Sequence, residues 1–194
     1  MARLKRLCVY CGSKSGVRPE YVEAARLLGR TLAARGIGLV SGGGRVGLMG
    51  EVADAVLAEG GEVTGVITDK LMALEVGHDG LTELFVVESM HARKTMMAHL
   101  ASAFVVLPGA WGTMEEMFEV LTWTQLGYHS KPVGLLDVAG YYGPLLAFAD
   151  RAVEEGFLSA EHRALLVARG SVEALFAALE AADLRRGPRW IDEP

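Results

Sequence analysis

Strand-like and helix-like segments alternate almost throughout this chain of 194 residues. Short apolar runs are typical of strands, and apolar residues spaced three and four apart are typical of helices. The expected strands are 4–10, 37–40, 62–67, 84–87, 103–107, 132–136 and 165–167, and the expected helices are 19–35, 47–58, 90–101, 113–125, 142–155 and 171–182. This alternation predicts an α/β fold, in which a parallel sheet is covered by helices on both faces.

Length and composition favour one globular domain, expected over 1–184, followed by a polar tail, 185–194. The net charge is −5, and nothing in the sequence suggests the basic stripe of a protein that binds nucleic acid. Its apolar runs are shorter than the roughly 20 residues that span a membrane. The N-terminal residues do not form a signal peptide. We therefore expect a cytoplasmic protein without nucleic-acid or membrane partners.

The two cysteines, Cys8 and Cys11, have the spacing of a redox pair or of half a zinc site. They also fit a simpler interpretation, as two small buried residues at the end of the first strand. Residues three apart on a strand point to opposite faces, so the thiols are expected to diverge. No second cysteine pair completes a tetrahedral zinc site, and no metal is expected.

The glycine-rich run 42–47 matches G-x-G-x-x-G between a strand and a helix. That pattern occurs in dinucleotide-binding folds, so an NAD-dependent enzyme is one alternative. The run follows the second strand, however, and no acidic residue stands at a strand end at the expected distance. We favour the interpretation that the run 42–47 is a loop that binds phosphate but no dinucleotide. The other interpretation is a glycine-rich turn that only allows a helix to pack closely on a strand. With the loop 12–16, which includes Ser13, the glycines Gly43, Gly44, Gly109 and Gly112 are expected to line one anion pocket.

A carboxylate lies on the first turn of the helix expected from Thr113, directly after the glycines of 107–112. A helix start preceded by glycine suits an anion such as phosphate, so Glu116 there indicates a site that binds phosphate and uses a carboxylate chemically. Another explanation is structural. Thr113 and Glu116 fit a capping box, in which the two side chains only start the helix.

Met90, Arg93 and Lys94 fall on one face of the helix expected from 90, after the fourth strand. Two cations at a strand end suit a phosphate or a leaving group. A solvated helix face with ordinary ion pairs is an equally good explanation when this segment is taken alone.

Three segments together resemble the LONELY GUY (LOG) family of cytokinin riboside 5′-monophosphate phosphoribohydrolases, which is often mislabelled as lysine decarboxylase. They are 41–50 (SGGGRVGLMG), 90–94 (MHARK) and 108–116 (PGAWGTMEE), the last matching the signature PGGxGTxxE. One departure is Ala110, which replaces the second glycine of the signature. A methyl group there is tolerated only if the residue keeps a negative φ. No pyridoxal phosphate site with its lysine is evident, so decarboxylation finds no support.

The resemblance implies a Rossmann-like doubly wound fold, no cofactor, a homodimer, and hydrolysis of a nucleoside 5′-monophosphate to a free base and ribose 5-phosphate. It places the catalytic arginine and glutamate at Arg93 and Glu116. Nucleotide contacts would come from Glu75, Arg93, Lys94, the stretch Ala110, Trp111, Gly112, Thr113, Met114, Glu115 and Glu116, and Thr122, while Met90 is a candidate to line the base pocket. A protein that binds or senses AMP without cleaving it, and the NAD-dependent enzyme, remain the alternatives.

Overall fold

The computed structural model describes residues 4–74 and 76–182. Its strands are β1 (Arg6–Tyr10), β2 (Gly38–Ser41), β3 (Val63–Thr68), β4 (Glu83–Val87), β5 (Ala103–Val106), β6 (Val133–Leu136) and β7 (Leu166–Arg169). Its helices are α1 (Pro19–Ala34), α2 (Gly47–Ala58), α3 (Asp69–Ala73), α4 (Met90–Leu100), α5 (Trp111–Gln125), α6 (Gly143–Glu154), α7 (Ala160–Arg163) and α8 (Val172–Ala181), with a short 3-10 turn, η1 (Val138–Gly140).

The seven strands form one parallel sheet in the order β4-β3-β2-β1-β5-β6-β7. The expected α/β fold with a doubly wound parallel sheet is therefore confirmed. The chain first winds outward from β1 to β4, then crosses back to pair β5 with the other side of β1. Loops leave the carboxyl ends of β1 and β5 in opposite directions, which opens a crevice between them.

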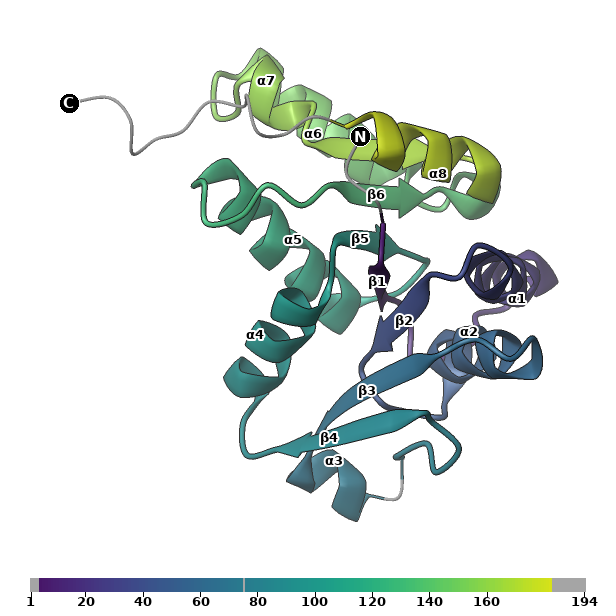
Figure 1. The fold of residues 1–194 in the computed structure, drawn as a ribbon. Coiled ribbons are helices and arrows are strands. Elements are labelled where there is room, and N and C mark those ends of the chain that lie inside the picture. Colours follow the sequence, from purple (N-terminus) through teal and green to yellow (C-terminus); the bar gives the residue numbers. More distant parts are fainter. Residues whose placement is uncertain (1–3, 75, 183–194) are drawn as a thin grey trace.

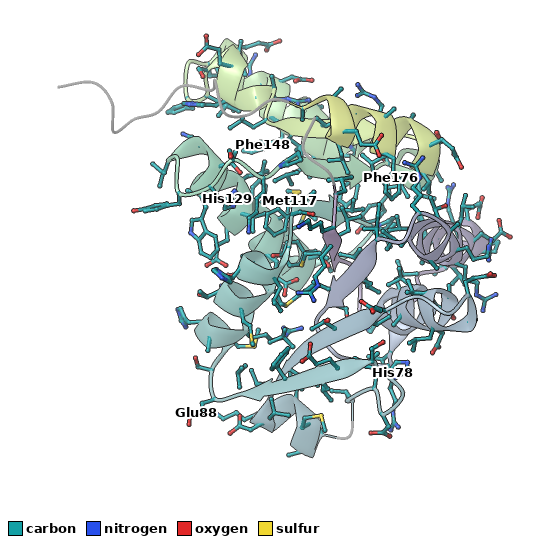
Figure 2. All side chains as sticks on the ribbon, in the orientation of Figure 1. His78, Glu88, Met117, His129, Phe148 and Phe176 are labelled. Atoms are coloured by element: carbon teal, nitrogen blue, oxygen red, sulfur yellow. The ribbon has the colours of Figure 1, made fainter. Side chains whose placement is uncertain are left out.

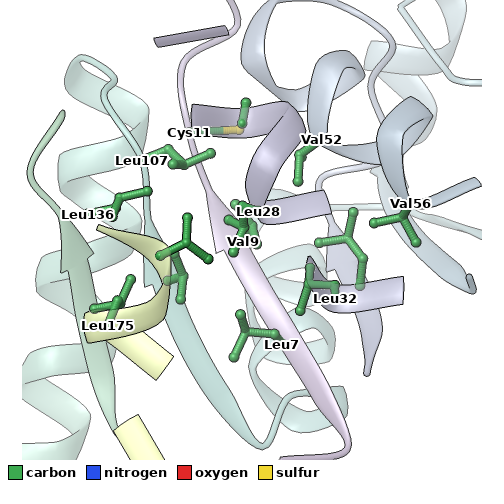
Figure 3. Close-up of a cluster of buried hydrophobic side chains, with 14 of the residues drawn as sticks. Leu7, Val9, Cys11, Leu28, Leu32, Val52, Val56, Leu107, Leu136 and Leu175 are labelled. Carbon is green, nitrogen blue, oxygen red and sulfur yellow. The ribbon is translucent and has the colours of Figure 1, made fainter. Parts of the chain in front are cut away.

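Helices cover both faces of the sheet (Figure 1), and alternate residues of β1 supply the two cores. Leu7, Val9 and Cys11 pack with α1, α2 and α8 on one face (Figure 3). Cys8 and Tyr10 pack on the other face with α4 and α5. Met117 of α5 and Phe176 of α8, both labelled in Figure 2, belong to these separate cores.

The cysteines follow the simpler interpretation. Both are free and buried, and they lie in different cores. Burial raises the pKa of both thiols well above the ordinary range, so neither is a ready nucleophile.

Most expected elements appear within one or two residues, and Ser89 caps α4 as expected by accepting from the N–H of Ala92. The expected start of α5 at Thr113 was wrong, because the helix begins at Trp111 after Ala110. The short helices α3 and α7 were not expected, since each is a single turn with no buried residue to give it an apolar face. Within the described ranges, no helix has the length and apolar character to cross a membrane.

Candidate active site

A cavity of about 780 Å³ lies at the carboxyl edge of the sheet, where β1 and β5 diverge. Its walls come from the loop after β1, the glycine run after β2, the end of β3 and the loop that leads from β5 into α5. Its polar lining residues include Ser13, Arg93 and Glu116. Its apolar lining residues, called here the apolar wall, include Val46, Leu48, Met49, Ile67, Leu71 and Val76.

The glycine run after β2 holds the guanidinium of Arg93. Arg93 Nε donates to the Val66 carbonyl at 2.9 Å, and Nη2 donates to the Gly42 carbonyl at 3.1 Å. A Cβ atom at position 42 would collide with Arg93 Nη2, so glycine is required there by close approach. Arg93 is buried, and these two carbonyls fix the plane of its guanidinium.

Glu116 lies against Arg93 within the cavity. Arg93 Nη1 and Glu116 Oε1 are 3.6 Å apart, and 8% and 13% of the two side chains are exposed. Burial raises the pKa of Glu116 from 4.5 to about 7, and the positive charge of Arg93 opposes part of that rise. A carboxyl group with such a pKa takes up and releases a proton near neutral pH, as a general base requires.

The capping-box explanation for Glu116 does not hold in this structure. Because α5 begins at Trp111, Thr113 is the third residue of the helix, and Ala110 occupies the cap without a side-chain hydrogen bond. The sequence pattern misplaced the start because a hydroxyl residue normally caps a helix. As a result, the N–H groups of residues 109–113 donate to no other described residue. Unpaired first-turn N–H groups are suited to an anion.

The N–H groups of the glycine run are, by contrast, already engaged. Gly43 donates to Ser41 Oγ at 3.2 Å, Gly44 to Met49 Sδ at 3.2 Å, and Arg45 to the Val76 carbonyl at 2.9 Å. A pyrophosphate bound in the Rossmann manner would need such groups. This loop therefore serves Arg93 rather than a dinucleotide.

The comparisons with known proteins identify the family of this chain. The family model described as "Possible lysine decarboxylase" matches residues 49–179. A cytokinin riboside 5′-monophosphate phosphoribohydrolase of Arabidopsis thaliana is 51% identical over 92% of this chain and 82% of its own length. One of Oryza sativa subsp. japonica is 49% identical over 99% of this chain and 80% of its own length. This chain belongs to the LOG family.

Solved structures support the fold alone. A molybdenum cofactor binding protein of Rippkaea orientalis superposes with a TM-score of 0.70 at 19% identity, over 93% of this chain and 98% of that one. A molybdenum cofactor carrier protein of Chlamydomonas reinhardtii gives a TM-score of 0.70 at 22% identity, over 92% and 97%.

The site positions predicted from the sequence fall into two groups. The cavity is lined by Ser13, Gly44, Arg93, Gly109, Ala110, Gly112, Thr113 and Glu116. Gly43, Met90, Lys94, Trp111, Met114, Glu115 and Thr122 are not among its lining residues. Glu75 lies outside the described residues. Ala110 has a φ of −114°, so the condition for an alanine in the signature is met.

Lys94 is turned toward α5. Its Nζ donates to Glu115 Oε1 at 2.5 Å and to Glu119 Oε1 at 3.1 Å. The hydrogen bond to Glu115 is the main reason that the pKa of Lys94 is raised. These contacts join α4 to α5 directly beside the Arg93–Glu116 pair.

Two parts of the cavity were not foreseen from the sequence. The apolar wall of Ile67, Leu71 and Val76 comes from the end of β3, α3 and the segment after it, which carry no motif. Tyr141 comes from the turn after β6. Only the order of the strands could have indicated Tyr141. Because β6 lies next to β5, the residues that follow β6 leave the sheet beside the loop that follows β5. Among the described residues, no group of three or more His, Cys, Asp or Glu side chains is arranged to hold a metal ion.

Proposed function

We propose that this protein hydrolyses the N-glycosidic bond of an adenosine 5′-monophosphate with an apolar N6 substituent, giving the free base and ribose 5-phosphate. The observation that carries the proposal is the buried Arg93–Glu116 pair, 3.6 Å apart, in a cavity beside the open start of α5. The LOG relatives, about half identical to this chain, are named for this reaction on cytokinin riboside 5′-monophosphates.

Glu116 acts on the ribose and the attacking water. Cleavage of the bond from C1′ to the base nitrogen gives the sugar oxocarbenium character, which a nearby carboxylate stabilises. The water oxygen then bonds to C1′ while its proton passes to Glu116, whose pKa of about 7 suits that transfer. The base leaves with the electron pair of the broken bond and takes up a proton.

Arg93 stabilises the negative charge that develops on the leaving base. Its Nε and Nη2 are bound to carbonyls, whereas Nη1 is directed to Glu116 and, at 4.0 Å, to Met90 Sδ. A preorganised cation of this kind contributes to the rate without moving during the reaction.

The 5′-phosphate binds at the start of α5, where the N–H groups of residues 109–113 and the Thr113 hydroxyl are available. Binding energy from this remote group positions the bond that breaks. Lys94 and Glu115 assist through the helix pair rather than from the cavity wall, since each is bound to the other.

The apolar wall receives the N6 substituent. Met49, Ile67, Leu71 and Val76 line the cavity and offer no charged group to a base. Burial of an isopentenyl chain there gains about 0.8 kcal/mol for each CH₂ group removed from water. The prenylated nucleotide is therefore preferred over AMP.

The remaining features follow from the same proposal. Hydrolysis needs water and no cofactor, and the protein acts in the cytoplasm on a small nucleotide without nucleic acid or membrane. It works as a homodimer, for which the exposed apolar side chains of Met90, Trp111 and Phe118 on α4 and α5 provide a contact surface.

Base release tests the proposal directly. The protein is incubated separately with N6-isopentenyl-AMP, AMP and adenosine, and the free base is measured by chromatography. We expect fastest release from the prenylated nucleotide, slower release from AMP and little from adenosine. The Glu116→Gln and Arg93→Ala variants should fall by about 10²–10³ in rate. Binding of AMP without release would instead support a sensor, and binding of NAD alone an NAD-dependent enzyme.

A further inference from the structure

The turn between β6 and α6 is bonded to the loop that precedes α5. Tyr141 Oη donates to the Gly109 carbonyl at 2.7 Å, and Tyr142 Oη donates to the Leu107 carbonyl at 2.7 Å. The Gly12 N–H donates to the carbonyl between them, Pro108, at 3.0 Å. Three successive carbonyls of the loop are thus held from outside it.

Peptide planarity gives these contacts a consequence. The carbonyl of one residue and the N–H of the next lie on opposite sides of a trans peptide group. Holding the Pro108 carbonyl therefore orients the N–H of Gly109, and holding the Gly109 carbonyl orients the N–H of Ala110. Both N–H groups belong to the unpaired set at the start of α5.

The turn that carries the tyrosines is itself constrained. Ala139 has a φ of 54°, the only positive value among the described non-glycine residues, and a residue with a side chain adopts this left-handed conformation at an energetic cost. Asp137 Oδ1 accepts from the Tyr142 N–H at 2.7 Å and fixes the end of the turn. The Tyr141 ring packs edge-on against Tyr21, with ring centroids 5.8 Å apart.

We propose that Tyr141 is a positioning residue for the 5′-phosphate: its hydroxyl holds the Gly109 carbonyl so that the neighbouring N–H groups face the phosphate monoester. The inference rests on the proposed function. Tyr142 is buried and supports the same loop from within the core, whereas Tyr141 lines the cavity and is partly exposed. Removal of the Tyr141 hydroxyl is therefore expected to affect phosphate binding more than folding.

The test compares wild type with Tyr141→Phe, which keeps the ring and removes the hydroxyl. A net hydrogen bond contributes about 1 kcal/mol, so we expect the Kd for AMP to rise about fivefold to tenfold. The Kd is measured by calorimetry with Glu116→Gln present in both proteins, because that variant is expected to release base slowly. The ratio of kcat/KM for the nucleotide to that for the nucleoside should fall by the same factor, with the melting temperature unchanged. Tyr128→Phe is the control, because Tyr128 is exposed, lies outside the cavity wall, and its hydroxyl bonds to no described residue.

An unchanged Kd for AMP in Tyr141→Phe would overturn the inference. So would an equal loss with nucleotide and nucleoside, which would indicate a general effect on the cavity. Failure of the proposed function is a separate result, since it would appear as the absence of base release by the wild type. AMP affinity in the Glu116→Gln background is measured with little turnover and tests Tyr141 in either case.

Discussion

Glu116 links the chemistry of the site to the stability of the fold. Its carboxyl group has a pKa of about 7 in the folded protein and 4.5 without that environment. Between these pH values the folded chain holds a proton that the unfolded chain has lost, so this group's contribution to stability is full below pH 4.5 and declines as pH rises through 7. The free energy of unfolding is therefore expected to fall by roughly 3 kcal/mol between pH 4.5 and a pH above 7 because of this group.

Glu116→Gln is therefore expected to change stability in a pH-dependent way. Its melting temperature should match that of wild type near pH 4.5 and exceed it above pH 7, because the amide does not ionise. Thermal unfolding at pH 4.5, 6 and 8 measures the difference. A constant difference in melting temperature between the variant and wild type across this pH range would show that the pKa of the Glu116 carboxyl group is not raised.

Gly42 has a geometric role that a single methyl group tests. Gly42→Ala would place a Cβ atom against Arg93 Nη2 and displace the guanidinium from its carbonyl partners. We expect kcat to fall at least tenfold, because the cation would no longer be preorganised. Gly170→Ala is the matched control, since a Cβ atom there meets nothing within 4 Å. Equal activity of both variants would remove Gly42 from the positioning of Arg93.

At the scale of elements, two adjacent sets of ion pairs join α4 to α5, an inner set in the cavity and an outer set beside it. Arg93 faces Glu116 inside the cavity, and Lys94 contacts Glu115 and Glu119 beside it. Lys94→Met removes the outer ion pairs to Glu115 and Glu119. The distance between Arg93 and Glu116 should then increase, and kcat should fall about tenfold with little change in KM. Steady-state kinetics separate this result from direct phosphate binding by Lys94, which would raise KM instead.

A second pair of helices supplies the control for that variant. Arg26 of α1 and Glu51 of α2 are 2.7 Å apart on the surface, and the Arg26 side chain is about half exposed. Arg26→Met should leave kcat and KM unchanged and alter stability by less than about 1 kcal/mol. A comparable loss of kcat in both variants would indicate a general effect of helix–helix ion pairs.

At the scale of the whole molecule, α5 exposes Trp111, 90% of whose surface is open, and Phe118 two turns later. Large exposed apolar side chains on neighbouring helices are typical of an interface. We expect a dimer in analytical ultracentrifugation and a monomer for Trp111→Glu. Phe157→Glu, which changes an equally exposed aromatic residue after α6, should remain dimeric. A wild-type monomer at micromolar concentration would exclude the proposed assembly.

The overall architecture was predictable because each apolar run is short and each helix carries periodic apolar residues. The site was predictable where motifs follow strands, as with Arg93 after β4 and Glu116 after β5. The partners of backbone groups were not predictable. The sequence does not show that the N–H groups of Gly43 and Gly44 donate to Ser41 and Met49, on either side of their loop. Nor does it show that the Tyr141 hydroxyl reaches the Gly109 carbonyl from 32 residues away. Those contacts depend on the three-dimensional crossing of loops, which local periodicity does not encode.

Ala110 also bears on how related proteins are found. Its backbone lies at a φ of −114° and a ψ of −138°, and the side chain is exposed, so a methyl group fits without displacing a neighbour. A search pattern that demands two adjacent glycines would reject this chain and any relative with serine or alanine there. Allowing small residues at that one position would widen the set of recognisable phosphoribohydrolases while keeping the glycine before it strict.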